Sequence, residues 1–211
     1  MVSAQRYIVV EGLPGAGKTG LAKVLVEALS ARFVEDPAGK NPFFDAYQKD
    51  PAGAAFSLQV FSFLSRFRQQ QELAQGELFG GGIVSDYLFD RDRIYANLTL
   101  GEAEMSLYSQ LLRMMAREAL PIPDLVVYLQ ASTEVLRQRQ QQVSHRPGLD
   151  GEALAALGQA YNHFFFHYNA SSLLVVNTND LDLRTGGRDL DDLVDRVLQT
   201  QVGTQYYTPK K

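Results

Sequence analysis

A glycine-rich stretch near the N-terminus constrains the fold of this chain more than any other feature. Residues 12–19 read GLPGAGKT and fit the pattern G-x-x-x-x-G-K-[ST]. The preceding residues 6–11 are mostly apolar and β-branched, and residues 21–29 carry apolar side chains at helical spacing. Such glycines let backbone N–H groups surround a phosphate at the N-terminus of a helix. The pattern therefore predicts a strand, a phosphate-binding loop and a helix, in that order.

The loop also assigns individual roles. Lys18 is expected to place its charge against the phosphoryl group that is transferred, and Thr19 is expected to ligate Mg²⁺. An ordinary glycine-rich turn between a strand and a helix is the alternative interpretation. The residues that we expect to bind a nucleotide here are Gly12, Gly15, Ala16, Gly17, Lys18 and Thr19.

Apolar and β-branched runs alternate with helical patterns along the rest of the chain. This alternation predicts an α/β fold of three layers, with a five-stranded parallel sheet covered by helices on both faces. We expect one domain over residues 1–201 and a mobile tail over 202–211. The predicted strands are 6–11, 32–35, 83–86, 125–129 and 173–176, and the predicted helices after the first are 53–75, 101–119, 132–142, 151–169 and 189–200.

Two acidic residues end predicted strands. Ligands of parallel α/β sheets bind at the carboxyl ends of the strands, where Glu35 and Asp86 are expected to lie. A carboxylate at this edge can take a proton from a hydroxyl or help to hold Mg²⁺; the alternative is a charge that meets only water.

Composition narrows the classes of function. The formal charge of −4 argues against a nucleic-acid partner, and the absence of cysteine excludes disulfides and thiolate metal sites. With no long apolar run, we expect a cytoplasmic protein that has no membrane partner.

Four further segments carry a resemblance to a known family. They read FVEDPAGKNPFFDAY, AFSLQVFSFLSRFR, SDYLFDRDRIYA and RQRQQQVSHRP. Together with the glycine-rich loop they resemble the deoxynucleoside kinases, especially the bacterial members that act on purine deoxynucleosides. The resemblance covers residues 6 to about 177. It implies a P-loop kinase fold, ATP and Mg²⁺, and a homodimer formed through the long helices.

The resemblance also implies roles for single residues. Glu35 matches the base that deprotonates the 5′-hydroxyl, and Tyr47 matches the tyrosine that contacts the 3′-hydroxyl. Gln59 and Arg66 match residues that face the nucleobase, with Asp92 as the acid expected to pair with Arg66.

Two positions depart from the family pattern. Tyr87 follows Asp86 where many members have arginine, so Arg91 or Arg93 is expected to take over that role. Asn162 stands where the family commonly has the glutamate that binds the 3′-hydroxyl, which predicts looser discrimination at that group.

A candidate lid covers residues 137–148. Arg139 and Arg146 are expected to stabilise the charge of the transferred phosphoryl, with Arg137 as a third candidate. A solvated helix face is the alternative. His163 and His167 are spaced for a metal site, but the three phenylalanines between them favour packing.

These features together predict a kinase that moves the γ-phosphoryl of ATP to the 5′-hydroxyl of a purine deoxynucleoside. A nucleoside monophosphate kinase, such as a thymidylate kinase, shares the loop but needs basic residues for the phosphate of its acceptor. The segment after the second strand offers Glu35, Asp36 and Pro37 instead. A non-catalytic nucleotide-binding regulator is the second alternative, and it lacks the support of an N-K-x-D motif.

Overall fold

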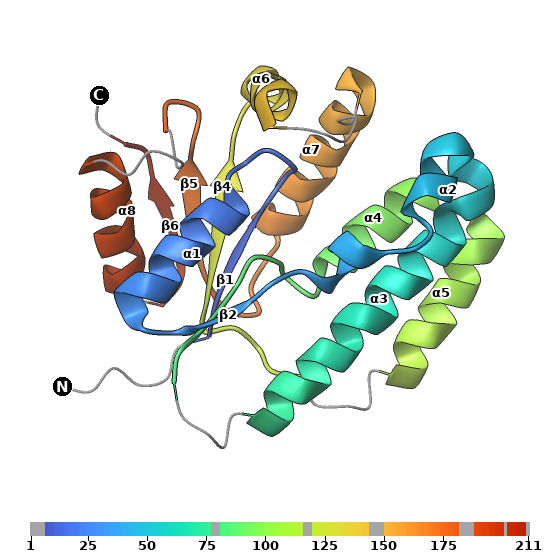
Figure 1. Ribbon diagram of the computed structural model, residues 1–211, viewed down its shortest axis with the longest axis horizontal. Helices are drawn as coiled ribbons and strands as arrows, with labels where there is room; N and C mark the ends of the chain where they lie inside the picture. The colour runs from blue at the N-terminus through green and yellow to red at the C-terminus, as the bar shows by residue number, and fades with distance from the viewer. Residues whose placement is uncertain are drawn as a thin grey trace. The chain divides into compact units, whose positions relative to one another are not determined.

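The structure, a computed structural model, describes residues 7–76, 81–115, 120–143, 150–181, 188–200 and 202–209 (Figure 1). The contacts between residues divide the chain into two compact units. Unit 1 comprises Met1–Glu35, Gly81–Leu88 and Ile122–Lys211, and unit 2 comprises Asp36–Gly80 and Phe89–Pro121.

Unit 1 is built around a parallel sheet. Within the described residues the sheet has six strands in the order β2-β3-β1-β4-β5-β6. The inner strands are buried because helices cover both faces, which explains their nearly continuous runs of valine, leucine and isoleucine. The strands are β1 (Tyr7–Gly12), β2 (Arg32–Val34), β3 (Ile83–Ser85), β4 (Leu125–Gln130), β5 (Ser172–Asn177) and β6 (Thr204–Tyr207).

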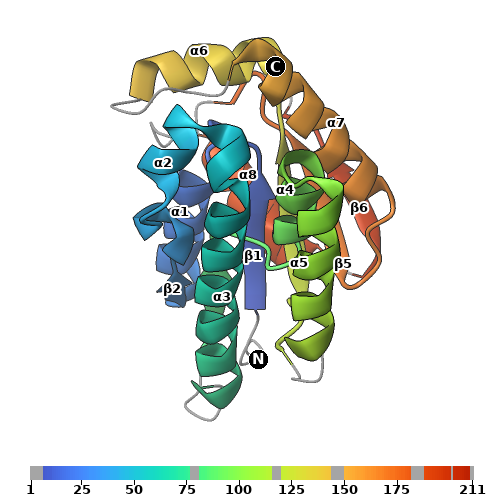
Figure 2. The ribbon, with the colours of Figure 1, turned by 90° about the vertical axis from the view of Figure 1, so that its right-hand side faces the viewer.

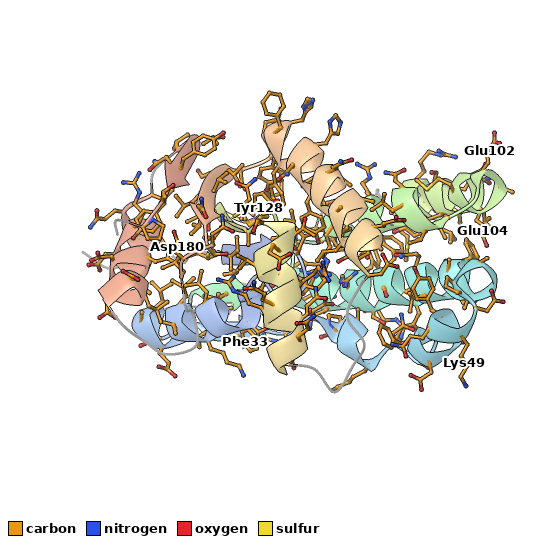
Figure 3. The ribbon with its side chains drawn as sticks, turned by 90° about the horizontal axis from the view of Figure 1, so that it is seen from above. Phe33, Lys49, Glu102, Glu104, Tyr128 and Asp180 are labelled. Carbon is orange, nitrogen blue, oxygen red and sulfur yellow. The ribbon has the colours of Figure 1, made fainter. Side chains whose placement is uncertain are left out.

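Three helices cover the two faces of this sheet. Helices α1 (Lys18–Leu29) and α8 (Arg188–Gln199) lie on one face, and α7 (Gly151–Phe166) lies on the other (Figures 2 and 3). The ring of Tyr128 on β4 stacks on Phe165 of α7, with 4.0 Å between the centroids. A further helix, α6 (Thr133–Val143), follows β4 at the carboxyl ends of the strands (Figure 1).

Unit 2 is helical. Its core contains Phe63, Phe67, Ala96 and Tyr108, and the rings of Phe63 and Tyr108 meet edge to face at 5.7 Å. These side chains come from three helices and bury a small apolar cluster between them. The elements are η1 (Pro37–Lys40), α2 (Phe44–Lys49), α3 (Pro51–Gly76), α4 (Arg91–Thr99) and α5 (Glu102–Met115).

The predicted parallel sheet with flanking helices is confirmed, but one strand and the helix after β3 were missed. The sheet has a sixth strand, β6, in the segment that we expected to be a mobile tail. Helix α5 begins at Glu102 and is described only to Met115, while residues 116–119 lie outside the described part of the chain. Helix α4 was not predicted, because its buried face includes Arg91 and Asp92, which an amphipathic pattern would assign to solvent. No helix in the described ranges is long and apolar enough to cross a membrane.

Candidate active site

The glycine-rich loop joins β1 to α1 at the carboxyl edge of the sheet. Gly12 has φ +156, and a Cβ there would lie 2.6 Å from the carbonyl oxygen of Leu129. Gly15 has φ +88, and a Cβ would lie 3.2 Å from the carbonyl oxygen of Leu136 on α6. Both positions therefore require glycine, for the backbone angle and for the close approach of β4 and α6. The side chain of Gln140 on α6 also donates to the carbonyl of Pro14, at 3.0 Å.

Lys18 and Thr19 begin α1 directly after this loop. The Lys18 ammonium donates to the carbonyl oxygens of Gly12 at 2.8 Å and Leu13 at 3.2 Å. The Thr19 hydroxyl donates to Oδ2 of Asp86 at 2.6 Å. Three predicted residues of unit 1 thus lie at one end of α1, where the helix terminus favours an anion.

Thr19 and Asp86 form an oxygen donor set that suits Mg²⁺. This ion is usually held by one or two protein oxygens together with water and the oxygens of substrate phosphates. No group of three or more His, Cys, Asp or Glu side chains able to hold a metal occurs in the described part of the chain. The hydroxyl and carboxylate next to the phosphate-binding loop fit the predicted ion by the chemistry of their oxygens.

Glu35 lies beside Asp86 at the same sheet edge. Val34 and Ser85 are paired across β2 and β3, and each acid is the next residue along its strand. The N–H of Asp86 donates to the carbonyl of Val34 at 3.3 Å. Neighbouring strands are about 4.8 Å apart, so the two carboxylates start from adjacent backbone positions. Glu35 is exposed, whereas Asp86 is buried.

Glu11 completes this edge and was not predicted as a site residue. It is fully buried and accepts hydrogen bonds from the N–H groups of Gly12 and Leu88 and from the hydroxyl of Tyr161. A carboxylate directly before the glycine-rich loop, at the end of an apolar strand, is the only sequence signal that could have identified it.

The predicted lid arginines are placed unequally. The guanidinium of Arg139 donates to the carbonyl oxygens of Thr178 and Leu181 and to the hydroxyl of Thr178. These bonds anchor α6 to the segment after β5. Arg137 is exposed on α6, and Arg146 lies outside the described residues.

Asn162 also belongs to unit 1. Its Oδ1 accepts from the Tyr128 hydroxyl at 3.0 Å and from Nε2 of Gln130 at 2.8 Å. The acceptor end of this exposed amide is thus engaged, and its Nδ2 is the end that suits a ligand. The nearby His163 and His167 are both exposed with their rings 4.7 Å apart, so the expected packing does not extend to these histidines.

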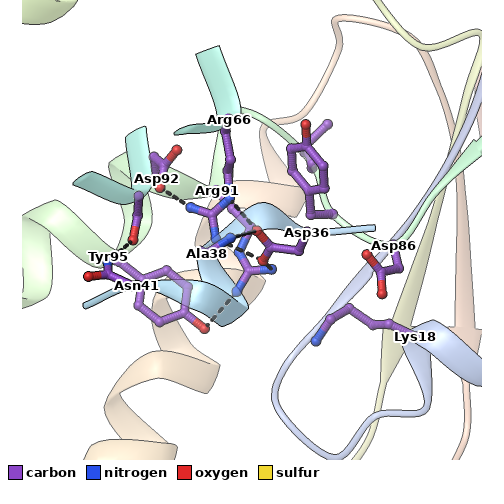
Figure 4. Close-up of polar contacts among 12 residues, drawn as sticks. Lys18, Asp36, Ala38, Asn41, Arg66, Asp86, Arg91, Asp92 and Tyr95 are labelled. Carbon is purple, nitrogen blue, oxygen red and sulfur yellow. Dashed lines mark hydrogen bonds and ion pairs between the residues drawn. The ribbon is translucent and has the colours of Figure 1, made fainter. Parts of the chain in front are cut away.

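Unit 2 contains a network of two arginines and two aspartates (Figure 4). Arg66 binds Asp36 with two hydrogen bonds, Nε to Oδ1 at 2.9 Å and Nη2 to Oδ2 at 2.8 Å, and its Nη1 binds Oδ1 of Asp92. Arg91 donates to Oδ2 of Asp36 at 3.2 Å, and its guanidinium lies 5.2 Å above the ring centroid of Tyr95. The predicted pairing of Arg66 with Asp92 is present, and Asp36 is an additional member.

The network separates the pKa values of its two carboxyls. Burial alone raises the pKa of Asp36, but the guanidinium groups of Arg91 and Arg66 outweigh burial and lower the pKa to about 2. Burial raises the pKa of Asp92 to about 6, because it outweighs the opposing effect of Arg66 and Arg91. Oδ2 of Asp92 is buried and has no hydrogen-bond partner among the described residues.

The other predicted residues of unit 2 lie on α2, α3 and α4. Gln59 is buried, and its amide donates to the Thr99 hydroxyl at 3.2 Å, while Tyr47 is half-buried on α2. Of the two arginines proposed to replace the missing one, Arg91 is in the network and Arg93 is exposed. A pocket of about 250 Å³ is lined mainly by apolar side chains but also by Asp92; Gln59 does not line it.

Comparison with known proteins decides the family. The family model for deoxynucleoside kinases matches residues 8–202. The chain belongs to the deoxynucleoside kinase family. It is therefore an enzyme, a kinase that phosphorylates deoxynucleosides, as the resemblance implied.

Individual members of the family are similar over most of their length. The deoxyadenosine/deoxycytidine kinase of Bacillus subtilis is 24% identical over 199 residues, covering 90% of each chain. The deoxyadenosine kinase of Lactobacillus acidophilus is 26% identical, covering 85% of this chain and 89% of the relative. A solved structure of deoxyadenosine kinase from M. mycoides with bound dATP has a TM-score of 0.76 at 23% identity, covering 92% of this chain and all of that one. These similarities support the fold that unit 1 displays.

Proposed function

We propose that this kinase transfers the γ-phosphoryl group of ATP to the 5′-hydroxyl of a purine deoxynucleoside. The observation that carries the proposal is the meeting of Lys18, Thr19 and Asp86 at the sheet edge where Glu35 also lies. We assign phosphoryl transfer to residues of unit 1 and recognition of the base to residues of unit 2.

Glu35 is the general base in this proposal. It is exposed, so its carboxylate can reach a hydroxyl, take the proton and leave the oxygen to attack the γ-phosphorus. Asp36 is a poor candidate, although it is the next residue. Both of its oxygens are bound by arginines and its pKa is near 2, so it has little tendency to take a proton.

Lys18 and the loop N–H groups act on the nucleotide. A flexible ammonium at the start of α1 can move from the loop carbonyls to the phosphates, where it balances the charge that spreads over the transferred group. A bound Mg²⁺ would supply positive charge that offsets the charge of the phosphates. Thr19 and Asp86 would hold that ion through one hydroxyl and one carboxylate oxygen.

Base recognition is assigned to Asp92 and Arg66. Oδ1 of Asp92 is bound to Arg66, and Oδ2 is a buried acceptor that needs a donor. Adenine, guanine and cytosine carry an exocyclic NH₂ that can donate to it, whereas thymine presents a carbonyl oxygen. An unsatisfied buried acceptor costs about 1–3 kcal/mol, which favours the amine-bearing bases. The purine preference is supported by relatives named as deoxyadenosine kinase and deoxyguanosine kinase, while the Bacillus subtilis relative named for deoxyadenosine is named for deoxycytidine as well.

The sugar would be contacted by Tyr47 and Asn162. Asn162 can offer a donor from Nδ2 to the 3′-hydroxyl, in place of the glutamate acceptor that the family commonly has. A homodimer in the cytoplasm completes the proposal. Sedimentation of the purified chain at several concentrations tests the dimer.

The decisive experiment compares acceptors. We expect the enzyme with ATP and Mg²⁺ to phosphorylate deoxyadenosine and deoxyguanosine with a higher kcat/KM than deoxycytidine, and all three to exceed thymidine. Thymidine as the best acceptor would overturn the proposed base recognition. Faster transfer to thymidine monophosphate than to any nucleoside favours a monophosphate kinase, and ATP binding without transfer to any acceptor favours a regulator.

A further inference from the structure

Glu11 is the most deeply buried acid in the described part of unit 1. It lies on β1 immediately before the phosphate-binding loop, and its exposed fraction is 0%. A carboxylate in such a place is costly unless hydrogen bonds replace its contacts with water. The proposed reaction uses Lys18, Thr19, Glu35 and Asp86 but gives Glu11 no role, so its burial needs another explanation.

The hydrogen bonds of Glu11 connect three segments. Oε1 accepts from the N–H of Gly12 at 2.8 Å and from the Tyr161 hydroxyl at 3.3 Å. Oε2 accepts from the N–H of Leu88 at 2.7 Å. Gly12 begins the phosphate-binding loop, Tyr161 is on α7, and Leu88 is two residues beyond Asp86. One side chain thus joins the loop to the segment that carries the acid proposed to hold Mg²⁺.

The two carboxylate oxygens of Glu11 hold different segments. Oε1 holds the start of the loop, and Oε2 holds the backbone after β3. The bonds to N–H groups are short and made to a charged acceptor, the kind that fixes geometry most strongly. Because Asp86 also accepts from Thr19, its carboxylate is positioned from the loop side by Thr19 and from its own backbone side by Glu11.

We propose that Glu11 is a positioning residue that fixes the Asp86 segment against the phosphate-binding loop, so that Mg²⁺ and nucleotide strengthen each other's binding. The proposal rests on the proposed function in assigning Mg²⁺ to Thr19 and Asp86. In this proposal Glu11 acts through the backbone at Leu88 and Gly12 and not by contact with the ion or the nucleotide. Residues that orient the ligands of a metal typically change metal affinity 10- to 100-fold when substituted.

Glu11→Gln separates the two tasks of the carboxylate. The amide keeps one acceptor, which is best placed towards the two donors Gly12 and Tyr161; in that orientation its NH₂ group faces the N–H of Leu88. Two donors then face each other, and the Asp86 segment is released while the loop stays held. The substitution should therefore weaken the contribution of Mg²⁺ more than it weakens nucleotide binding.

The test measures the affinity of the full chain for ADP by calorimetry, with Mg²⁺ and with EDTA. The dissociation constant in EDTA divided by the dissociation constant with Mg²⁺ reports how strongly the ion favours nucleotide binding. We expect this ratio to fall about tenfold or more in Glu11→Gln, while ADP affinity in EDTA stays within about threefold of wild type. Val9→Ala is the matched control, because Val9 is equally buried on β1 and has no carboxylate. It should lower the melting temperature and leave the ratio unchanged.

An unchanged ratio in a folded Glu11→Gln variant overturns the proposal, and so does an equal loss in Val9→Ala, since destabilisation alone would then explain it. If Glu11→Gln does not fold, Glu11→Asp takes its place: the shorter side chain cannot reach both N–H groups, and a wild-type ratio there also refutes the role. If the ratio in the variant is unchanged although the wild-type enzyme phosphorylates deoxynucleosides, the role of Glu11 is refuted and the proposed function stands. A ratio near one in the wild-type protein would refute the assignment of Mg²⁺ to Thr19 and Asp86, and the role of Glu11 would be refuted with it.

Discussion

The sheet edge of unit 1 and the ion-pair network of unit 2 position charged groups in different ways. At the sheet edge, backbone pairing sets the places of Glu35 and Asp86, because each follows a residue of a register pair. In the network, Arg66 on α3 is held by the carboxylates of Asp36 and Asp92, which come from other elements. The sheet therefore sets the backbone positions of the first site, whereas the side chains of the second site hold one another in place.

The largest expected effect comes from the sheet edge. Lys18→Ala should lower kcat by a thousandfold or more, because the ammonium stabilises the charge of the transferred phosphoryl. The fold should persist, since the ammonium bonds to the carbonyls of Gly12 and Leu13 lie within its own loop. Steady-state kinetics and a melting curve check both parts. Turnover within tenfold of wild type would show that another group carries this charge.

Glu35→Gln is expected to rank next. The amide keeps the shape of the side chain and removes its basicity, so kcat should fall by about 10²- to 10⁴-fold. ATP affinity should change little, as the proposed role concerns the acceptor hydroxyl. Asp36→Asn is the neighbouring control: a comparable loss of kcat without a loss of stability in that variant would move the base to Asp36.

Substitutions in the network are expected to lower the free energy of unfolding. Asp36→Ala leaves Arg66 and Arg91 without one carboxylate partner, and breaking such a pair costs about 1–3 kcal/mol for a partly buried acid. A double-mutant cycle with Arg91→Ala, followed by urea unfolding, should give a coupling energy of about 1 kcal/mol. Additive losses would mean that the charges act independently.

The smallest expected effect is a pH dependence of binding. The pKa of Asp92 is raised to about 6, so the carboxylate that accepts from the base is protonated as pH falls through 6. Deoxyadenosine affinity should fall by up to about tenfold between pH 7 and pH 5, since a tenth of the acid stays ionised one unit below its pKa. Asp36, with a pKa of about 2, stays ionised throughout this range. Calorimetry at several pH values with wild type and Asp92→Asn checks this, and an equally steep profile in the variant would assign the titration to another group.

The contrast between the sheet edge and the ion-pair network explains which site residues the sequence could predict. The glycine-rich loop and the strand-end acids have local signatures, because a strand, a turn and a helix follow one another in fixed order. Asp36 and Arg91 have none: their contacts depend on how η1, α3 and α4 pack, and neither spacing nor periodicity encodes that. The pairing of Arg66 with Asp92 was predicted only because the resemblance suggested it.

Buried charge and edge strands were the main sources of error. Glu11 was treated as part of an apolar strand, although its buried carboxylate accepts hydrogen bonds from Gly12, Leu88 and Tyr161. Strand β6 was missed because its residues alternate between half-buried and exposed and follow a glycine, a pattern typical of a tail as well as of an edge strand. Arg146 and the rest of the lid up to residue 148 stay predictions.

The order of the strands has a consequence for synthesis of the protein on the ribosome. Tyr7 of the central strand β1 donates its N–H to Asp124, 117 residues further along the chain, just before the neighbouring strand β4. Synthesis adds about 5–20 residues per second, so many seconds pass between the synthesis of β1 and that of this partner. Strands β5 and β6 are made later still. All residues of unit 2 are made before β4. The helical unit can therefore fold while the strands of unit 1 are still exposed, and this interval is when the nascent chain is most open to aggregation and to chaperones.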